Sequence, residues 1–465
     1  MINSSSRESI FALSTSYGQS AIAVIRISGE QAKKIAGRVC GRTKLAQRYA
    51  YLCKIKDLQG KLIDEGMVVF FKSPKSYTGE DLLEIHTHGS IAVINRLIKV
   101  LSDFPQTRPA LPGEFSKRAF QNGKGNLLKY EGLNNLILSE TENQRLMATK
   151  QTFGESENIC FLWREGMARI LAMIDAVIEF SDDVDTLELN SIEQSIRTII
   201  NQTHNILKNA AVAKELNFGF NILIFGPPNV GKSSFFNLLC QDDKTITSSL
   251  QGTTRDQTSS QIDLFGNKIN ITDSAGIRET RDPVEKKGIK KTFQSLSIFK
   301  KLILVLSPDS FNKQNVDGVF SVLKKIKRKK MVVIFNKTDL SGSKRKYEAW
   351  TKHIPELTNY YSFEISCKNS RNNSKTLKPL FDFINQNLIA VDRNENDDYY
   401  FSDQRQLECI KRINSNLKNS LEHLRELEIS ADFLRNALKE TDDLYGRSDE
   451  DNKLGIIFKN FCIGK

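Results

Sequence analysis

The spacing of apolar residues differs between parts of this chain: some parts have short apolar runs typical of strands, and others have the spacing of three and four residues typical of helices. Within the first 122 residues, short apolar runs predict strands, and the spacing over Ile91–Leu101 predicts a helix. The expected strands are Ser20–Ile27, Leu52–Ile55, Met67–Phe71 and Leu82–His88. Strands and helices mixed in this way indicate an α/β domain at residues 1–122.

Helical spacing dominates the two segments that flank residues 218–380. Apolar positions recur three and four residues apart over 123–217 and again over 381–465. Between them, the chain alternates strand-like and helix-like runs, which is the pattern of a doubly wound sheet. Because the chain ends of an α/β domain commonly lie close together, the simplest topology inserts residues 218–380 into a discontinuous helical domain with halves at 123–217 and 381–465. The expected fold class is therefore α/β plus α.

A glycine-rich segment follows the first strand of the alternating region. Residues 226–233 read Gly-Pro-Pro-Asn-Val-Gly-Lys-Ser, which fits the phosphate-binding P-loop pattern, and they come directly after the apolar run Asn221–Phe225. Glycines in such a loop let backbone N–H groups turn toward a polyphosphate. Lys232 would supply a charge to the β- and γ-phosphates, and the Ser233 hydroxyl can ligate Mg²⁺.

Two further segments of a phosphate site follow in order. Gly252-Thr-Thr-Arg-Asp256 places Thr254 on a switch loop, where its hydroxyl can reach Mg²⁺ and the γ-phosphate. Asp273-Ser-Ala-Gly276 follows the strand-like run Lys268–Ile271, so its carboxylate would hold the metal through water and its last N–H would face the γ-phosphate. Motif matches that arise by chance do not usually arrive in sequence order.

Asn336-Lys-Thr-Asp339, directly after the apolar run Met331–Phe335, indicates which base is bound. The Asp339 carboxylate can accept hydrogen bonds from N1–H and the N2 amine of guanine, and adenine lacks that donor pair. The motifs therefore favour GTP over ATP, and Ser366-Cys-Lys368 is a further segment that would touch the base. The expected GTP-binding residues are Asn229, Val230, Gly231, Lys232, Ser233, Ser234, Ser248, Ser249, Leu250, Gln251, Gly252, Thr253, Thr254, Asp273, Ser274, Ala275, Gly276, Asn336, Lys337, Asp339, Ser366 and Cys367.

The residue after the Asp-x-x-Gly segment differs from that of small signalling GTPases, which place a Gln there to orient water. Here it is Ile277, which cannot do so, and Arg278, Glu279 and Glu285 are the nearby candidates. Asn229 in the P-loop could help to hold a monovalent cation where the charge of an arginine finger would otherwise lie, or it could only stabilise the loop.

Charge and cysteine content narrow the function classes. The 465-residue chain has a net charge of +12, which fits a nucleic-acid partner, although the basic run Lys324–Lys330 is typical of a solvated face. Its seven cysteines are scattered without a C-x-x-C pair, which argues against a disulfide framework or a zinc site and favours a reducing, cytoplasmic location.

The sequence shows no signal pattern and no apolar run of about 18 residues, so we expect no membrane segment. His86 and His88 would share one strand face, where a metal pair is possible but surface or pocket histidines are the preferred interpretation.

Three local sequences outside the alternating region add a family resemblance. They are Tyr77-Thr-Gly-Glu-Asp-Leu-Leu-Glu-Ile-His-Thr-His-Gly89, Ala110-Leu-Pro-Gly-Glu-Phe-Ser-Lys-Arg-Ala-Phe120 and the final Cys462-Ile-Gly-Lys465. Together with the inserted GTPase motifs, they resemble the MnmE (TrmE) family of bacterial and organellar tRNA-modification GTPases. The resemblance runs essentially from end to end.

This resemblance implies a homodimer that assembles through an N-terminal domain binding 5,10-methylene- or 5-formyl-tetrahydrofolate. It also implies a heterotetramer with an FAD-binding partner of the MnmG type. Together they would add an aminomethyl or carboxymethylaminomethyl group at C5 of the wobble uridine, position 34, of certain tRNAs. GTP hydrolysis would be stimulated by K⁺ and would drive dimerisation of the GTPase domains.

The matched motifs also imply roles for individual residues. Glu285 matches the family residue thought to orient the hydrolytic water, and Cys462 matches the cysteine that modification requires; Arg278 is the third expected catalytic residue. The implied ligands are Ser233 and Thr254 for Mg²⁺, Asn229, Ser248, Leu250 and Thr253 for K⁺, and Arg26, Glu84, Lys124 and Lys465 for the folate.

The chain departs from the family pattern at three places: Gly18-Gln-Ser-Ala, Lys124-Gly-Asn-Leu127 and the polar stretch Asn369–Ser374. Two alternative functions stay open. One is a K⁺-dependent GTPase of the ribosome-assembly type, which would normally carry an RNA-binding module. The other is a scaffold that binds GTP and its partner without modifying tRNA, a reading suggested by the altered segment after Pro-Gly-Glu-Phe.

Overall fold

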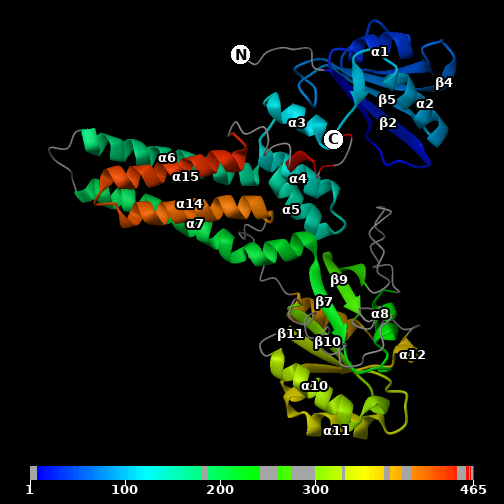
Figure 1. The fold of residues 1–465 in the computed structure, drawn as a ribbon, viewed down its shortest axis with the longest axis vertical. Helices are drawn as coiled ribbons and strands as arrows, with labels where there is room; N and C mark the ends of the chain where they lie inside the picture. Colours follow the sequence, from blue (N-terminus) through cyan, green and yellow to red (C-terminus); the bar gives the residue numbers. More distant parts are fainter. Residues whose placement is uncertain are drawn as a thin grey trace. The chain divides into compact units, whose positions relative to one another are not determined.

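The computed structural model describes residues 8–179, 186–240, 259–273, 299–326, 330–370, 377–389, 401–447, 457–459, 461 and 464. The chain divides into two compact units. The first contains residues 1–137, 149–203 and 408–465, and the second contains residues 138–148 and 204–407. Each unit holds a sheet with helices, and the first also holds long helices packed on one another, which confirms the expected fold class of α/β plus α (Figure 1).

A six-stranded sheet with the order β3-β4-β5-β2-β1-β6 forms the amino-terminal part of the first unit. Strands β1 and β6 pair in parallel, and the other neighbours pair antiparallel. The elements are β1 Ser9–Leu13, β2 Ser20–Ser28, α1 Ala32–Val39, β3 Ala50–Lys56, β4 Leu62–Phe71, β5 Leu82–Gly89, α2 Ile91–Ser102 and β6 Thr107–Pro109.

Alternation along the strands gives this sheet two different faces. Ile25 and Ile27 of β2 are buried in a core with α1 and α2, whereas Arg26, between them, points to the opposite face. Glu84 of β5 lies directly across from Arg26 in the strand register, so it shares that opposite face. The sheet therefore has one apolar face under the helices and one face that carries charged side chains.

Long helices form the rest of the first unit, and they come from both ends of the chain. Asn414 of α14 donates to Thr203 Oγ1 of α7 at 2.8 Å, across 211 residues of sequence. Tyr445 of α15 donates to the Glu157 carbonyl of α6 at 2.7 Å. These contacts show the expected discontinuous helical domain. The helices that lie wholly in this unit are α3 Glu114–Gln121, α4 Leu127–Ile137, α6 Glu155–Glu179 and α15 Leu427–Tyr445. Helices α5 Glu142–Thr152, α7 Thr186–Phe218 and α14 Gln404–Glu422 lie partly in this unit and partly in the second.

The second unit contains a six-stranded sheet with the order β12-β11-β10-β7-β9-β8, in which β8 and β9 are antiparallel and the other pairs are parallel. Its strands are β7 Phe220–Phe225, β8 Ser259–Leu264, β9 Asn267–Asp273, β10 Lys301–Leu306, β11 Lys330–Phe335 and β12 Tyr361–Glu364. Its helices are α8 Lys232–Cys240, α10 Lys313–Lys325, α11 Ser343–His353, α12 Cys367–Ser370 and α13 Lys378–Phe383, with short helical turns at Pro308–Ser310, Pro355–Asn359 and Ile384–Leu388.

Strand β10 is apolar from Leu302 to Leu306 and shows why a central strand of this sheet needs apolar side chains on both faces. Ile303 and Val305 belong to the core that includes α8 and α13, while Leu302 and Leu304 belong to the core that includes α10 and α11. A parallel strand covered by helices on both faces buries both sets of side chains. The carboxyl ends of the parallel strands meet at one edge, where α/β sheets usually bind ligands. No helix in the described part of the chain combines the length and apolar character needed to cross a membrane.

Candidate nucleotide site and amino-terminal site

The loop between β7 and α8 brings its backbone close to neighbouring strands. Gly226 has a φ of +152°, and a Cβ there would lie 2.1 Å from the Val305 carbonyl oxygen. Gly231 has a φ of +92°, and its Cβ would lie 2.4 Å from Asn336 Nδ2. Both positions therefore need glycine, for space as well as for backbone conformation. Asn229 also takes a positive φ, of 62°, and its side chain is exposed.

The polar ends of Lys232 and Ser233 lie at the start of α8. The buried Lys232 donates from Nζ to the Pro227 carbonyl oxygen at 2.8 Å, so its charge lies inside the loop. Ser233 Oγ donates to Asp273 Oδ2, at the end of β9, at 2.9 Å. A hydroxyl and a carboxylate oxygen side by side are the hard donors that Mg²⁺ prefers, so these two residues fit the expected metal site.

Asn336 joins three of the predicted segments. Its Nδ2 donates to the Val230 carbonyl oxygen at 2.9 Å, and its Oδ1 accepts the Cys367 N–H at 3.1 Å. Lys337 donates from Nζ to the Asn229 carbonyl oxygen at 2.7 Å and to Asp309 Oδ2 at 2.7 Å. The P-loop is therefore tied to the loops that follow β11 and β12. Asp309 is a member of this site that the sequence motifs did not indicate.

Asp339 lies at the solvent edge of the same loop cluster. Its Oδ1 accepts a hydrogen bond from Ser366 Oγ at 2.6 Å, and this bond is the main cause that lowers the pKa of the Asp339 carboxyl. A pocket of about 270 Å³ opens beside it, lined by Gly231, Ser234, Asn336, Lys337, Asp339, Cys367 and Lys368. The pocket thus joins the P-loop to an ionised carboxylate, which is an acceptor for paired N–H donors.

The described P-loop, β9, Asn-Lys-Thr-Asp and Ser-Cys-Lys residues of the predicted GTP site meet in this cluster. The other predicted residues lie outside the described residues: Ser248, Ser249, Leu250, Gln251, Gly252, Thr253, Thr254, Ser274, Ala275, Gly276, Arg278, Glu285, Cys462 and Lys465, together with Ile277 and Glu279.

Arg26 and Glu84, two of the predicted folate residues, form an ion pair in the first unit. Arg26 donates to Glu84 Oε1 from Nε at 3.0 Å and from Nη2 at 2.7 Å. Its Nη1 donates to the carbonyl oxygen of Gly464, the penultimate residue, at 3.4 Å, and Ser14 Oγ donates to the same oxygen at 3.2 Å. A hydrogen bond from His86 and the charge of Arg26 lower the pKa of the Glu84 carboxyl. Gly464 therefore lies beside this pair.

Lys124 and the two histidines occupy separate surroundings. Lys124 follows α3 in the turn where its N–H donates to the Ala119 carbonyl oxygen at 2.9 Å, and its Cε lies 3.2 Å from where a Cβ on Gly79 would be. His86 is 3.4 Å from Glu84 Oε2, and the exposed His88 is 2.9 Å from Asp64 Oδ1. In the ranges that the structure covers, no three His, Cys, Asp or Glu side chains gather in a way that could hold a metal ion.

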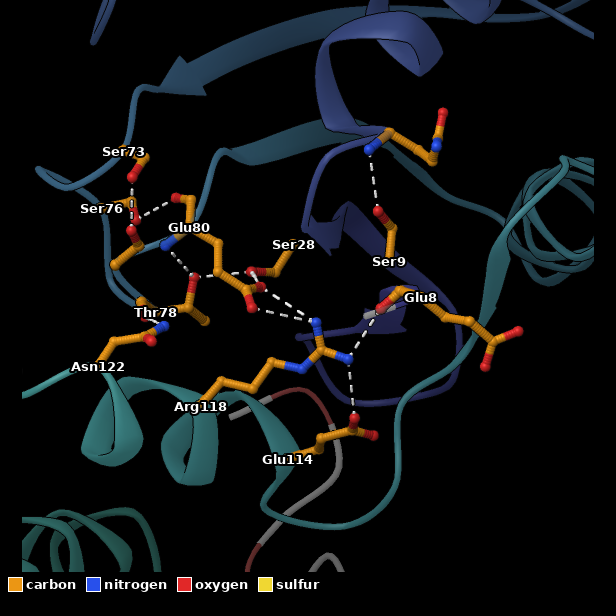
Figure 2. Close-up of polar contacts among 12 residues, drawn as sticks. Glu8, Ser9, Ser28, Ser73, Ser76, Thr78, Glu80, Glu114, Arg118 and Asn122 are labelled. Carbon is orange, nitrogen blue, oxygen red and sulfur yellow. Dashed lines mark hydrogen bonds and ion pairs between the residues drawn. The ribbon is translucent and has the colours of Figure 1, made fainter. Parts of the chain in front are cut away.

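Figure 2 shows a buried ion cluster that the sequence did not reveal. Arg118 of α3, with 6% of its side chain exposed, donates to Glu80 Oε2 at 3.1 Å and to Glu114 Oε1 at 3.0 Å. It also donates to the Glu8 carbonyl oxygen at 2.9 Å, and Ser28 Oγ donates to Glu80 at 2.7 Å. The two signature segments, around Glu80 and around Glu114, are thus bound to each other. The charged residues of the two segments could have suggested an ion pair, but no local sequence pattern shows which distant residues pair with each other.

The chain is similar to known proteins over its whole length. Residues 9–124 match the family described as GTP-binding protein TrmE N-terminus, and residues 127–462 match the MnmE helical domain. The tRNA modification GTPase MnmE of Rickettsia canadensis (strain McKiel) is 34% identical, and that of Pelagibacter ubique (strain HTCC1062) is 35% identical; each alignment covers 98% of this chain and 100% of the relative.

Two solved structures show a more distant similarity. Aquifex aeolicus Era bound to GDP.AlF4- is 22% identical, with a TM-score of 0.27 over 42% of this chain and 66% of that chain. The bacterial selenocysteine-specific elongation factor EF-Sec is 17% identical, with a TM-score of 0.25 over 36% of this chain and 29% of that chain. The full-length relatives and the two family matches agree with the P-loop geometry described above. They establish that this chain belongs to the MnmE family of tRNA modification GTPases.

Proposed function

We propose that this protein hydrolyses GTP with Mg²⁺ and K⁺ and uses the hydrolysis in the modification of tRNA. The observation that carries the nucleotide part is the Asp339 carboxylate, which accepts a hydrogen bond from Ser366 and lies at the edge of the pocket beside the P-loop. Guanine offers two adjacent N–H donors to such a carboxylate. A nucleotide bound there would extend its phosphates over the loop that holds Lys232.

The chain's own residues would divide the hydrolytic work. Lys232 supplies a fixed positive charge inside the P-loop, and Ser233 and Thr254 would hold Mg²⁺, which neutralises charge on the transferred phosphoryl group. Asn229 would offer its exposed side chain to K⁺, with Ser248, Leu250 and Thr253 as the other ligands. Glu285 would orient the attacking water, since Ile277 has no group that can do so, and Arg278 would assist it.

Nucleotide turnover tests this part of the proposal. The purified protein should hydrolyse GTP and leave ATP unchanged, and its rate should be higher in KCl than in NaCl at equal ionic strength. Equal rates in the two salts would remove K⁺ from the proposal, and equal rates with the two nucleotides would remove the guanine-specific role of Asp339.

For the first unit, we propose binding of a tetrahydrofolate derivative by residues 1–122, with Lys124 and the carboxyl terminus. Arg26 and Glu84 lie beside the Gly464 carbonyl, so the sequence neighbours Cys462 and Lys465 are within a few residues of the same place. Folates carry both anionic carboxylates and hydrogen-bonding ring nitrogens, and a guanidinium next to a carboxylate suits that mixture. Cys462 would then be the thiol that acts next to the folate.

The sheet face opposite α1 and α2 would form the interface of a homodimer. Leu52 and Met67 face each other across β3 and β4 with 65% and 45% of their surface exposed, and Ile22 of β2 is 57% exposed. Exposed apolar side chains grouped on one sheet face are typical of an interaction surface. Sedimentation of the purified protein should give a dimer, and a charged residue at Leu52 should shift it to monomer.

The modification itself would require a partner. With an FAD-binding protein of the MnmG type, in a heterotetramer, the dimer would add the aminomethyl or carboxymethylaminomethyl group to C5 of the wobble uridine in the cytoplasm. The net charge of +12 is compatible with tRNA as the substrate. Mass spectrometry of tRNA nucleosides distinguishes this function from a GTP-binding scaffold or a ribosome-assembly GTPase, because neither alternative changes the wobble base.

A further inference from the structure

Tyr77 lies between the Arg26–Glu84 pair and helix α3. The Arg26 guanidinium carbon is 5.4 Å from the centroid of the Tyr77 ring, which is within the range of a cation–π contact. The Tyr77 hydroxyl is 2.8 Å from Oγ of Ser116, which is buried on α3. One side chain therefore connects the guanidinium to the helix that carries the second signature segment.

The backbone around Tyr77 is held on its carboxyl-terminal side. Asn122 Nδ2 donates to the Thr78 carbonyl oxygen at 2.7 Å, and Arg118 pairs with Glu80 at 3.1 Å. Figure 2 shows these contacts, in which Thr78, Glu80, Arg118 and Asn122 converge from the loop and the helix. Gly79 has a φ of +80°, a conformation that other residues rarely adopt. The loop thus has little freedom to move Tyr77.

The ring of Tyr77 is held as firmly as its hydroxyl. It packs against one apolar cluster that contains Ile10 and Phe115 and against a second that contains Leu127 and Phe458. Burial between two clusters fixes the plane of the ring, and a fixed ring presents one face to the guanidinium. The orientation of Arg26 therefore depends on contacts that reach from both signature segments.

Arg26 retains capacity to bind a ligand in this orientation. Its hydrogen bonds to Glu84 and to the Gly464 carbonyl use three of the five guanidinium N–H groups within the described residues. The two remaining donors can serve an anionic or carbonyl group of a ligand. If the guanidinium rotated off the Tyr77 ring, those two donors would lose a defined direction.

We propose that Tyr77 is a positioning residue for Arg26, and that the Arg118–Glu80 ion pair and the Ser116 hydroxyl hold Tyr77 in place for that purpose. The ligand in question is the tetrahydrofolate derivative, so this inference rests on the folate-binding function proposed above. Tyr77 acts through Arg26, which touches the ligand. This role explains what the Tyr-Thr-Gly-Glu segment does, and what Ser116 and Arg118 do in the segment that begins with Pro-Gly-Glu-Phe.

The test measures the dissociation constant of 5-formyltetrahydrofolate for the full-length protein in a double-mutant cycle. Tyr77→Leu removes the ring face and should weaken binding about 3- to 30-fold, the range of a cation–π contact. In an Arg26→Gln background, the same substitution should have no further effect, because the residue through which Tyr77 acts is gone. Tyr49→Leu is the matched control, since Tyr49 is an exposed tyrosine whose ring lies tilted against that of Tyr51, and it should bind as the wild type does.

Tyr77→Phe keeps the question answerable if Tyr77→Leu does not fold. It retains the ring and loses the hydroxyl contact with Ser116, so binding should weaken by about 2- to 10-fold, again without effect in the Arg26→Gln background. A loss that is equal in both backgrounds would mean that Tyr77 only stabilises the fold and would overturn the inference.

The remaining outcomes separate this inference from the proposed function. If Arg26→Gln weakens binding and neither Tyr77 variant does, the folate site stands and the positioning role is wrong. If Arg26→Gln binds the folate as tightly as the wild type, the folate site is wrong and the inference falls with it.

Discussion

Asp339 and Asn336 belong to the same four-residue motif, and their side chains have different tasks. The buried Asn336 amide bonds to the Val230 carbonyl and to the Cys367 N–H, so it holds loops together. The exposed Asp339 carboxylate bonds to Ser366 and keeps acceptor capacity toward the pocket. Base specificity should therefore depend on Asp339, and the shape of the site on Asn336.

Asp339→Asn should weaken GTP binding by about 100-fold, since two hydrogen bonds to a charged group are lost. It should favour xanthosine triphosphate, because the new amide N–H can donate to the oxygen that xanthine carries at C2. Titrating each nucleotide against the purified variant checks this. Asp317→Asn, at an exposed position on α10, is the control and should not change the preference. An unchanged ratio of the two affinities in Asp339→Asn would contradict the assigned role.

The residues of the nucleotide site were predictable because each motif is local. The P-loop and the Asn-Lys-Thr-Asp segment each fit within eight residues, and their chemistry needs that spacing. Asp309 was not predictable, since it reaches the site through Lys337 from another loop at 2.7 Å. The same holds for Arg118, whose partners Glu80 and Glu8 lie far away in sequence.

At the scale of elements, the P-loop depends on two close approaches of its backbone. The turn at Gly226 passes the Val305 carbonyl of β10, and the turn at Gly231 passes the Asn336 side chain. A side chain at either place would move the loop away from the strands that support it. Helix α8, which starts at Lys232, would move with it.

Gly231→Ala should therefore abolish measurable GTP binding while the helical domain stays folded. Its Cβ would lie 2.4 Å from Asn336 Nδ2, and the φ of +92° is strained for alanine. Gly318→Ala on α10 is the matched control, because no atom lies within 4 Å of its new Cβ, and alanine favours a helix. Nucleotide titration together with circular dichroism of both variants makes the comparison. Normal GTP affinity in Gly231→Ala would contradict the described loop.

Ion pairs connect helix α3 to the amino-terminal sheet and its loops. Burial acts to raise the pKa of Glu114, but hydrogen bonds from Arg108 and the Leu111 N–H and the charge of Arg118 outweigh it and lower that pKa. A carboxyl whose folded pKa lies below its unfolded value contributes stability above the unfolded value. That contribution is lost as the pH falls through the folded pKa.

Glu114→Gln should lower the thermal midpoint most at pH 7, by an amount that corresponds to about 1–3 kcal/mol for a charged hydrogen-bonding group. The difference from the wild type should shrink as the pH falls below the ordinary glutamate pKa of about 4.3, and it should vanish once the carboxyl of the folded protein is neutral as well. Thermal unfolding at several pH values between 7 and 3 measures this. Glu142→Gln, which breaks an exposed pair with Arg145, is the control. A difference that stays constant with pH would show that the charge of Glu114 does not hold α3.

Apolar runs predicted several strands, but they did not predict β1, Ser9–Leu13, or the start of β4, which is Leu62 where Met67 was expected. Ser20–Ile27 was expected and β2 is Ser20–Ser28, and Met331–Phe335 was expected and β11 is Lys330–Phe335. Strand β6, Thr107–Pro109, has no apolar alternation and is a strand because it pairs with β1. Such an edge strand depends on its neighbour, so its own sequence does not indicate it.

At the scale of the whole molecule, the nucleotide cluster and the Arg26–Glu84 pair lie in different compact units. The second unit holds the nucleotide cluster around Lys232 and Asp339, and the first unit holds Arg26 beside the carboxyl-terminal Gly464. Helix α7 contacts helix α14, although most of the second unit lies between them in the sequence. Helical periodicity predicted both halves, but only long-range contacts such as Asn414 with Thr203 show which helices meet.

The central claim is that this protein takes part in modifying the wobble uridine of tRNA, with Cys462 as the acting thiol. The most direct measurement is mass spectrometry of tRNA nucleosides from cells that lack the gene, complemented either by the wild type or by Cys462→Ser. Serine is close to cysteine in size, and the P-loop lies in the other compact unit, so the variant should keep its fold and its GTP hydrolysis. We expect the C5-modified uridine to disappear in the deletion, to return with the wild type and to stay absent with Cys462→Ser. Unchanged levels of the modified uridine in the deletion strain would contradict the claim.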